Sequence, residues 1–218
     1  MNRTLVFAAS VFVASVLGGL ALNLGGSAVP WMVSRVSGVV SFVLLSASVI
    51  FGLFLSTKAS DGAMPRAFVY TIHQFLSVLT LAFLGVHAGS LLFDGFFNFG
   101  PLQLVVPFAS QYRPFWVGAG VIAGWLAAIV TASFWMRASI GQKAWRKLHY
   151  ASFGAYLLAL SHGVFSGTDT TVPLVAFTYI ASVAAVTGLI VYRIRLSTRP
   201  ARQPLSASAR RRSPAEAA

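Results

Sequence analysis

The chain has 218 residues, of which 57% are hydrophobic and only 9% are charged, and its mean hydropathy is +0.78. A soluble domain carries about 25% charged residues, so this composition is typical of an integral membrane protein. The sequence has no cysteine, which excludes disulfides, iron–sulfur clusters and thiolate metal sites. It has four acidic residues and no phosphate-binding or Ser-His-Asp motif, so hydrolytic chemistry is not expected.

Stretches long enough to cross a bilayer follow one another along the chain. A crossing needs about 20 mostly apolar residues. The sequence meets this requirement at residues 5–22, 31–56, 67–93, 115–136, 144–166 and 172–192. The first stretch is longer than the apolar run of a signal peptide and is predicted to be a retained helix. We therefore predict an all-α fold, an integral membrane six-helix bundle over residues 1–196, embedded in the lipid bilayer.

The positions of the cations predict the orientation of this bundle. Arg35 and Arg113 fall on one side of the predicted bundle. The other fourteen Lys and Arg residues fall on the opposite side, in the N-terminus, the 57–66 and 137–147 connections and the C-terminal segment. Because cytoplasmic loops carry the excess of Lys and Arg, both termini are predicted to be cytoplasmic. The net charge of +12 then reflects the topology of a multi-pass protein of the cell membrane (inner or plasma membrane), and no nucleic-acid partner is expected.

Two segments lie outside the predicted spans. Residues 94–114 are too apolar for a solvated loop, but their Gly and Pro residues argue against a full crossing. An interfacial or re-entrant segment is expected there. Residues 197–218 are rich in Arg, Ser, Pro and Ala and are predicted to form a disordered basic cytoplasmic tail. Its arginines favour contact with anionic headgroups, with a docking site for a cytoplasmic partner as the alternative.

All four histidines of the chain lie in the third and fifth predicted spans. His73 and His87 are fourteen residues apart, about 21 Å along a helix, and His149 and His162 are thirteen apart, about 20 Å. Both spans run in the same direction, so His73 is level with His149 at the inner side and His87 is level with His162 at the outer side. Thirteen residues also leave two side chains about 140° apart around a regular helix. A local distortion near Gly154, an irregular start around His149, or two cofactors rotated relative to each other would accommodate this spacing.

This spacing favours two cofactors, each held between two imidazoles. A single metal ion cannot use ligands about 20 Å apart along one helix. Haem fits the pattern, because it is flat and apolar and takes axial nitrogen ligands between membrane helices. The alternative is that the histidines are buried polar residues that bond to backbone carbonyls or relay protons.

Four segments carry a resemblance to a known family. They are SRVSG at 34–38, PFASQYRP at 107–114, WRKLHYASFGAY at 145–156 and SHGVFSGTD at 161–169. With the two histidine spacings, they resemble the ferric reductase-like transmembrane domain family, the haem-bearing six-helix module of NADPH oxidases and fungal ferric reductases. The likeness is closest to standalone bacterial members, particularly actinobacterial ones, and covers about residues 30–195.

The resemblance implies the roles of individual residues. His73 and His149 would ligate an inner b-type haem, and His87 and His162 an outer one. Arg35 would lie beside the outer haem, unless it is an interfacial arginine whose head reaches the lipid headgroups. Weaker candidates to pair with haem propionates are Arg113 at the outer haem, and Arg66, Arg146 and Lys147 at the inner one.

The function that the resemblance implies is electron transfer across the membrane between two b-type haems. The donor would be a cytoplasmic flavoprotein, a flavin supplied by or shared with a partner, or a quinol, because only about 25 residues follow the sixth predicted span where oxidases carry FAD and NADPH domains. The acceptor would be ferric iron, dioxygen or a periplasmic protein, and oxidoreductase activity would depend on the separate donor. Two alternatives stay open: a non-catalytic haem-binding subunit that relays electrons to a periplasmic reductase docked on residues 94–114, and a haem-free transporter.

Overall fold

The computed structural model describes residues 28–57, 59–95, 97 and 99–198. Every regular element in these ranges is a helix, which confirms the predicted all-α class. The helices are α2 (Val29–Thr57), α3 (Arg66–Leu91), α4 (Pro101–Val105), α5 (Pro114–Ile140), α6 (Gln142–His149), α7 (Ala151–Ser166) and α8 (Pro173–Ser197). The predicted span at 5–22 and the predicted tail beyond residue 198 lie outside the described residues.

Within the described ranges, four helices are long and apolar enough to cross a membrane. They are α2, α3, α5 and α8, which correspond to the spans predicted at 31–56, 67–93, 115–136 and 172–192. Proline stands in the first turn of α5 and of α8, where its fixed φ and missing N–H are tolerated. The span predicted at 144–166 is not one continuous helix, because α6 and α7 are separated at Tyr150 and α7 has only 16 residues.

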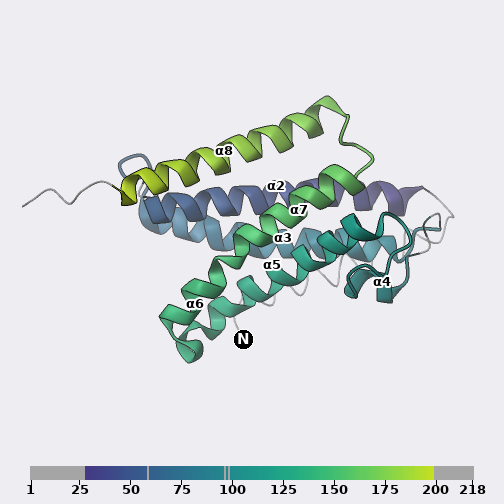
Figure 1. Ribbon diagram of the computed structural model, residues 1–218, viewed down its shortest axis with the longest axis horizontal. Coiled ribbons are helices and arrows are strands. Elements are labelled where there is room, and N and C mark those ends of the chain that lie inside the picture. The colour runs from purple at the N-terminus through teal and green to yellow at the C-terminus, as the bar shows by residue number, and fades with distance from the viewer. Residues whose placement is uncertain (1–27, 58, 96, 98, 199–218) are drawn as a thin grey trace, which may run out of the picture.

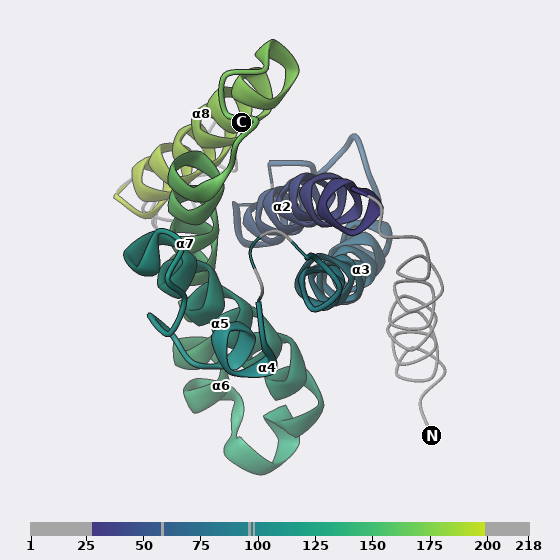
Figure 2. The same cartoon turned by 90° about the vertical axis from the view of Figure 1, so that its right-hand side faces the viewer.

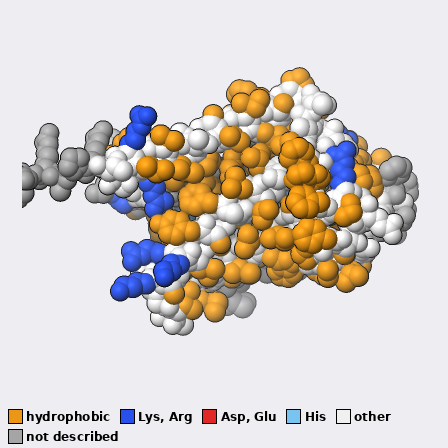
Figure 3. Space-filling model, in the orientation of Figure 1, with side chains coloured by type: hydrophobic (Ala, Val, Ile, Leu, Met, Phe, Trp, Pro, Cys, Tyr) orange, Lys and Arg blue, Asp and Glu red, His pale blue; other side chains and the backbone are white. Residues whose placement is uncertain are grey.

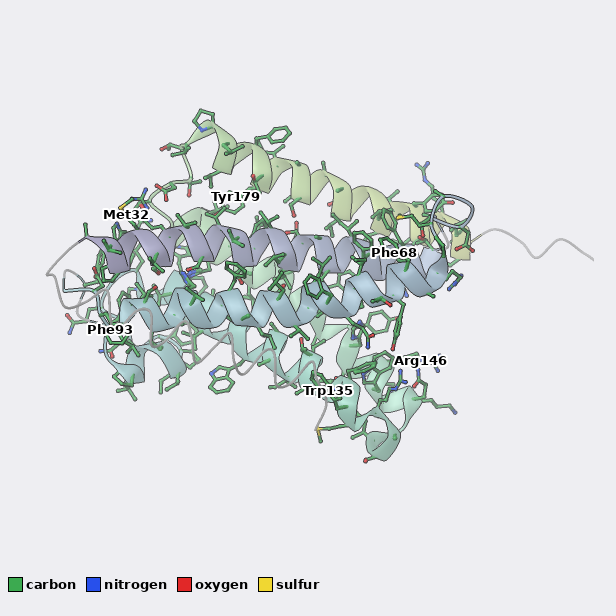
Figure 4. The ribbon with its side chains drawn as sticks, turned by 180° about the vertical axis from the view of Figure 1, so that it is seen from behind. Met32, Phe68, Phe93, Trp135, Arg146 and Tyr179 are labelled. Carbon is green, nitrogen blue, oxygen red and sulfur yellow. The ribbon has the colours of Figure 1, made fainter. Side chains whose placement is uncertain are left out.

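The helices α2, α3, α5, α7 and α8 alternate in direction along the chain, so that α2 and α8 run the same way, and α2 is central. It contacts α3, α7 and α8, while α5 packs mainly against α7 (Figures 1 and 2). Seen from behind, α2 and α3 lie along one another, with Met32 and Phe93 at one end and Phe68 at the other (Figure 4). α2 buries several serines. Oγ of one of them, Ser41, donates a hydrogen bond of 3.2 Å to the carbonyl of Thr80 in α3. Small polar side chains let two membrane helices approach closely, which explains this tight pair.

The apolar core lies between α2, α7 and α8. Phe42 of α2 stacks on Tyr156 of α7 at 5.9 Å between ring centroids and meets Tyr179 of α8 edge-on at 5.0 Å. A chain of hydroxyl groups crosses the same three helices. The Tyr156 hydroxyl lies 2.8 Å from Oγ of Ser182, which donates a hydrogen bond of 2.9 Å to Oγ of Ser46. These bonds satisfy buried polar groups, which the apolar interior of a membrane could not do.

The outer surface of the bundle is apolar along its sides and basic at one end. Large apolar side chains of α8 such as Leu174, Phe177 and Ile180 are exposed, as expected of side chains that face lipid. Lys and Arg gather at the end formed by α6 and the C-terminal part of α8 (Figure 3). The cations of these segments and of the last turn of α5 are Arg137, Lys143, Arg146, Lys147, Arg193 and Arg195.

The segment predicted to be interfacial or re-entrant returns along α5. It contains the short helix α4, and Nε1 of Trp125 donates a hydrogen bond of 2.9 Å to the carbonyl of Val105. Trp125 is eleven residues into α5, about 16 Å from its start. Phe108 packs against Gly118, where a Cβ would lie 2.4 Å from the Phe108 ring. The segment therefore folds back beside α5.

Candidate functional site

The structure brings the four histidines together in the two predicted pairs. In the inner pair, the ring centroids of His73 and His149 are 6.0 Å apart and the rings are inclined at 73°. In the outer pair, the ring centroids of His87 and His162 are also 6.0 Å apart, and the rings are inclined at 76°. Two imidazoles that share one metal ion have ring centres about 6 Å apart, because each metal–nitrogen bond is about 2 Å long. Both pairs have this separation.

α2 fixes the two imidazoles of α3. Nδ1 of His73 lies 2.8 Å from the carbonyl oxygen of Ser48, and Nδ1 of His87 lies 2.8 Å from that of Ser34. A carbonyl group can only accept, so Nδ1 carries the hydrogen and Nε2 of the neutral ring keeps its lone pair. Histidines that bind metals usually have this arrangement, in which the second ring nitrogen is held by a carbonyl or carboxylate.

A serine followed four residues later by a glycine occurs at both contacts of α2 with these imidazoles. Ser34 and Ser48 are each followed four residues later by a glycine, Gly38 or Gly52. A Cβ at Gly38 would lie 2.8 Å from Nδ1 of His87, and one at Gly52 would lie 3.2 Å from Cε1 of His73. The two serine–glycine units are fourteen residues apart, as His73 and His87 are. Because α2 and α3 are antiparallel, each unit meets one imidazole.

A backbone carbonyl of α5 accepts a hydrogen bond from His162, whereas His149 has no such partner among the described residues. Nδ1 of His162 donates a hydrogen bond of 2.9 Å to the carbonyl of Trp116, and a Cβ at Gly120 would lie 2.5 Å from this nitrogen. Nδ1 of His149 is buried without a hydrogen-bond partner among the described residues. The His149 ring instead packs on Trp145, with 5.1 Å between ring centroids. The four imidazoles are therefore held in two different ways.

The break between α6 and α7 lies within the thirteen residues that separate His149 from His162. His149 is the last residue of α6, and the N–H of Tyr150 bonds to the carbonyl of Lys147 at 3.2 Å, three residues back. The N–H of Phe153 bonds to the carbonyl of Tyr150 in the same way, at 3.1 Å. These i→i+3 bonds make the turn at Tyr150 tighter than the α-helices on either side of it. The irregularity expected around His149 is confirmed, while Gly154 lies within the regular part of α7.

A cavity adjoins each pair. The outer cavity has about 490 Å³ and is lined by His87 and His162. The inner cavity has about 210 Å³ and is lined by His73 and His149. Small residues make room in the outer cavity, among them Gly38, Gly85, Ala88, Gly120, Ala123 and Gly124. Leu45, Thr80 and Ala127 line both cavities, so the two sites are adjacent.

The structure places Arg35, but not Arg113, at the outer cavity. Arg35 forms a two-pronged ion pair with Asp169, in which Nε lies 2.6 Å from Oδ2 and Nη2 meets Oδ1, and both residues line the cavity. Arg113 lies at the start of α5 with a φ of +40° and donates a hydrogen bond to the carbonyl of Phe165. Its neighbour Tyr112 lines the outer cavity in its place. The sequence did not identify Asp169 as the partner of Arg35.

At the inner cavity the lining arginines are Arg146 and Arg193. Arg146 was a candidate from the sequence and lies at the α5–α6 end of the bundle (Figure 4). Arg193 was missed; it donates a hydrogen bond of 3.0 Å to the hydroxyl of Tyr150. Arg66 is engaged elsewhere, with Asp61 at 3.4 Å and the carbonyl of Leu55 at 3.1 Å. Lys147 is not among the residues that line this cavity.

Each site offers two imidazoles as metal ligands. This suits a metal whose other ligands belong to its cofactor. The part of the chain that the structure describes contains no group of three or more His, Cys, Asp or Glu residues that could hold a metal ion. A structural zinc ion requires four ligands, which a pair of imidazoles does not supply. The iron of a haem needs only axial ligands from the protein. At the outer pair, two facing imidazoles beside a mostly apolar cavity lined by small residues fit this cofactor.

No protein-family model, curated protein or solved structure matches the chain. The function proposed below is therefore supported by the histidine geometry and by the resemblance of the four sequence segments.

Proposed function

We propose that the chain is a di-haem b-type electron-transfer protein of the ferric reductase-like kind, which carries electrons across a membrane. The observation that carries this proposal is the recurrence of one geometry at two levels, with ring centroids 6.0 Å apart in both imidazole pairs. Haem would supply a reversible one-electron iron couple at each level. The two cavities share lining residues, which supports transfer between the levels.

Each side chain would have a defined part in this function. His73 and His149 would hold the inner haem, and His87 and His162 the outer one. Carbonyl groups fix both imidazoles of the outer pair, so both would stay in place to hold the cofactor. An acceptor would then take electrons at the edge of the cofactor, from the side of the outer cavity. Arg35 would present its charge to that cavity while Asp169 holds it in place.

The basic end of the bundle supports a cytoplasmic position for the inner pair. The cations of α6 and of the end of α8 lie at this end, and cytoplasmic segments carry the excess of Lys and Arg. The electron donor, a flavoprotein, a flavin shared with a partner or a quinol, would act here. Arg146 and Arg193 line the inner cavity, where guanidinium groups would bind the carboxylates of a haem.

The proposal is tested by counting haem. The full chain is purified from haem-replete cells, and a reduced-minus-oxidised visible spectrum is recorded together with the haem content per chain. Two b-type haems are expected. His87→Ala and His149→Ala should each leave one, and Thr178→Ala, which removes a hydroxyl bonded within exposed α8, should leave two. A chain without b-type absorption would contradict the proposal and favour the haem-free transporter.

A second candidate function is a non-catalytic subunit that relays electrons to a periplasmic reductase. It is favoured by the segment that returns along α5, which lines the outer cavity with Gln103 and Val105 and exposes Leu102 and Phe108. Exposed apolar residues beside a site of electron exit suit a docked protein. The two candidates differ in one assay. A chain that reduces ferric chelates with a reduced flavoprotein donor is a reductase by itself, whereas a relay subunit reduces only a periplasmic partner protein.

A further inference from the structure

We infer that His149 is the exchangeable member of the four imidazoles, so that the inner pair opens to admit a small neutral diatomic ligand while the outer pair stays closed. It rests on the proposed function, because the exchange takes place at an iron held by these side chains. In the exchange, the bond between iron and Nε2 of His149 breaks and a bond to the added ligand forms, with no change in the oxidation state of iron.

The hydrogen bonds provide the first line of evidence. Nδ1 of His73, His87 and His162 each donates to a backbone carbonyl at 2.8–2.9 Å. Such a bond fixes the orientation of the ring and makes Nε2 a stronger donor to a metal. Loss of this outer partner typically lowers metal affinity roughly 10–100-fold. His149 has no such partner among the described residues, so it is the weakest of the four ligands.

The backbone around His149 provides the second line. The other three histidines stand inside continuous helices, α3 and α7, where neighbouring turns hold the backbone on both sides. His149 ends α6, an eight-residue helix without buried residues, and the tightened turn at Tyr150 follows it. α6 can therefore move away from His73 by adjusting this turn and Gly141, without disturbing α7. The ring of His149 would move with α6.

The inner cavity borders the ring that would move. It has about 210 Å³ and is lined by His149 and by hydroxyl-bearing residues such as Ser77, Thr80 and Thr131. A diatomic molecule needs about as much space as one water, which occupies about 30 Å³ in the liquid. The proposed cofactor would occupy this cavity, so a diatomic ligand would take the place that the His149 ring leaves when α6 moves. The outer cavity is larger, but the carbonyls of Ser34 and Trp116 hold both of its imidazoles.

Carbon monoxide tests the inference on the purified full chain. The reduced protein is titrated with CO, and the visible spectrum reports how many haems bind it. We expect one CO for two haems in the wild-type chain and in Thr178→Ala. His162→Ala, which retains the inner haem, should bind CO there, while His149→Ala, which retains the outer haem, should bind none.

The outcomes separate the inference from the proposed function. A chain without haem defeats the proposed function before CO is added. A haem-loaded wild-type chain that binds no CO, or that binds two, overturns the inference by itself, even if a variant fails to fold. A wild-type chain that binds one CO, together with a His149→Ala variant whose remaining haem also binds CO, shows that the outer pair is the one that opens, and this too overturns the inference.

Discussion

The backbone carbonyl of Ser34 accepts a hydrogen bond of 2.8 Å from Nδ1 of His87, and the Ser34 hydroxyl donates one of 3.0 Å to the His87 carbonyl. Fourteen residues along α2, the carbonyl of Ser48 accepts the equivalent bond from Nδ1 of His73. α2 thus sets the orientation of both imidazoles that α3 contributes. It supplies no proposed metal ligand itself.

The glycines behind the imidazoles lead to a prediction about cofactor content. Gly120→Ala and Gly38→Ala would place a Cβ 2.5 Å and 2.8 Å from Nδ1 of His162 and His87, respectively. The affected ring must move, so each variant should lose the outer haem, about half of the total. Gly188→Ala on α8 is the matched control, because no atom of the described residues lies within 4 Å of its Cβ and alanine favours a helix by about 0.5–1 kcal/mol. Haem content per chain is the measurement, and an unchanged value in Gly120→Ala would contradict the prediction.

Gly52 should show a smaller effect of the same kind. A Cβ there would lie 3.2 Å from Cε1 of His73, so a shift of a few tenths of an ångström can accommodate it. Gly52→Ala should keep both haems but change the reduction potential of one, because the ring and its hydrogen bond to Ser48 are displaced. A redox titration of the visible spectrum would detect this shift. If both reduction potentials equal those of the wild-type chain, the added Cβ does not displace the His73 ring, and the prediction is wrong.

The ion pair between Arg35 and Asp169 should contribute modestly to stability. It joins α2 to the α7–α8 connection through two contacts, and the side chains are 38% and 20% exposed. Because water still screens part of the pair, we expect a coupling of about 1 kcal/mol in a double-mutant cycle of Arg35→Ala and Asp169→Ala, measured by thermal unfolding in detergent. Arg35→Lys should recover only part of it, since a lysine cannot form the two-pronged contact. Strictly additive effects of the two alanine variants would be inconsistent with this pair.

The hydroxyl chain through the core can be tested without altering the site. Tyr156→Phe removes the hydroxyl that bonds to Ser182 at 2.8 Å and leaves the stacked ring in place. Hydrogen bonds between membrane helices contribute about 0.6 kcal/mol on average, so the free energy of unfolding should fall by roughly that amount or somewhat more. Ser161→Ala is the control, because that hydroxyl is exposed and bonds only within its own helix. Equal stability of Tyr156→Phe and the wild-type chain would argue against the chain of bonds.

The sequence predicted the histidine pairing because each residue of a helix adds a fixed rise along its axis. Two spans that run in the same direction, with nearly equal histidine spacings, therefore place their histidines at matching depths. The same geometry left three alternatives open for the thirteen-residue spacing, and the tightened turn at Tyr150 corresponds to the one that placed an irregularity around His149. The carbonyl partners could not be predicted, since every residue has a carbonyl and only packing selects Ser34, Ser48 and Trp116. The repeated serine–glycine units were nevertheless a readable signal. The pairing of Arg35 with Asp169 could not be read, because it joins positions 134 residues apart.

Electron paramagnetic resonance of the oxidised, purified full chain tests whether two imidazoles hold an iron at each level. Two imidazoles on each iron, inclined at 73° and 76°, would produce low-spin ferric haem with the strongly anisotropic signal of nearly perpendicular axial rings. Two such signals of equal intensity are expected. A chain that carries no ferric haem signal, or one whose iron is high-spin at both levels, would contradict this expectation.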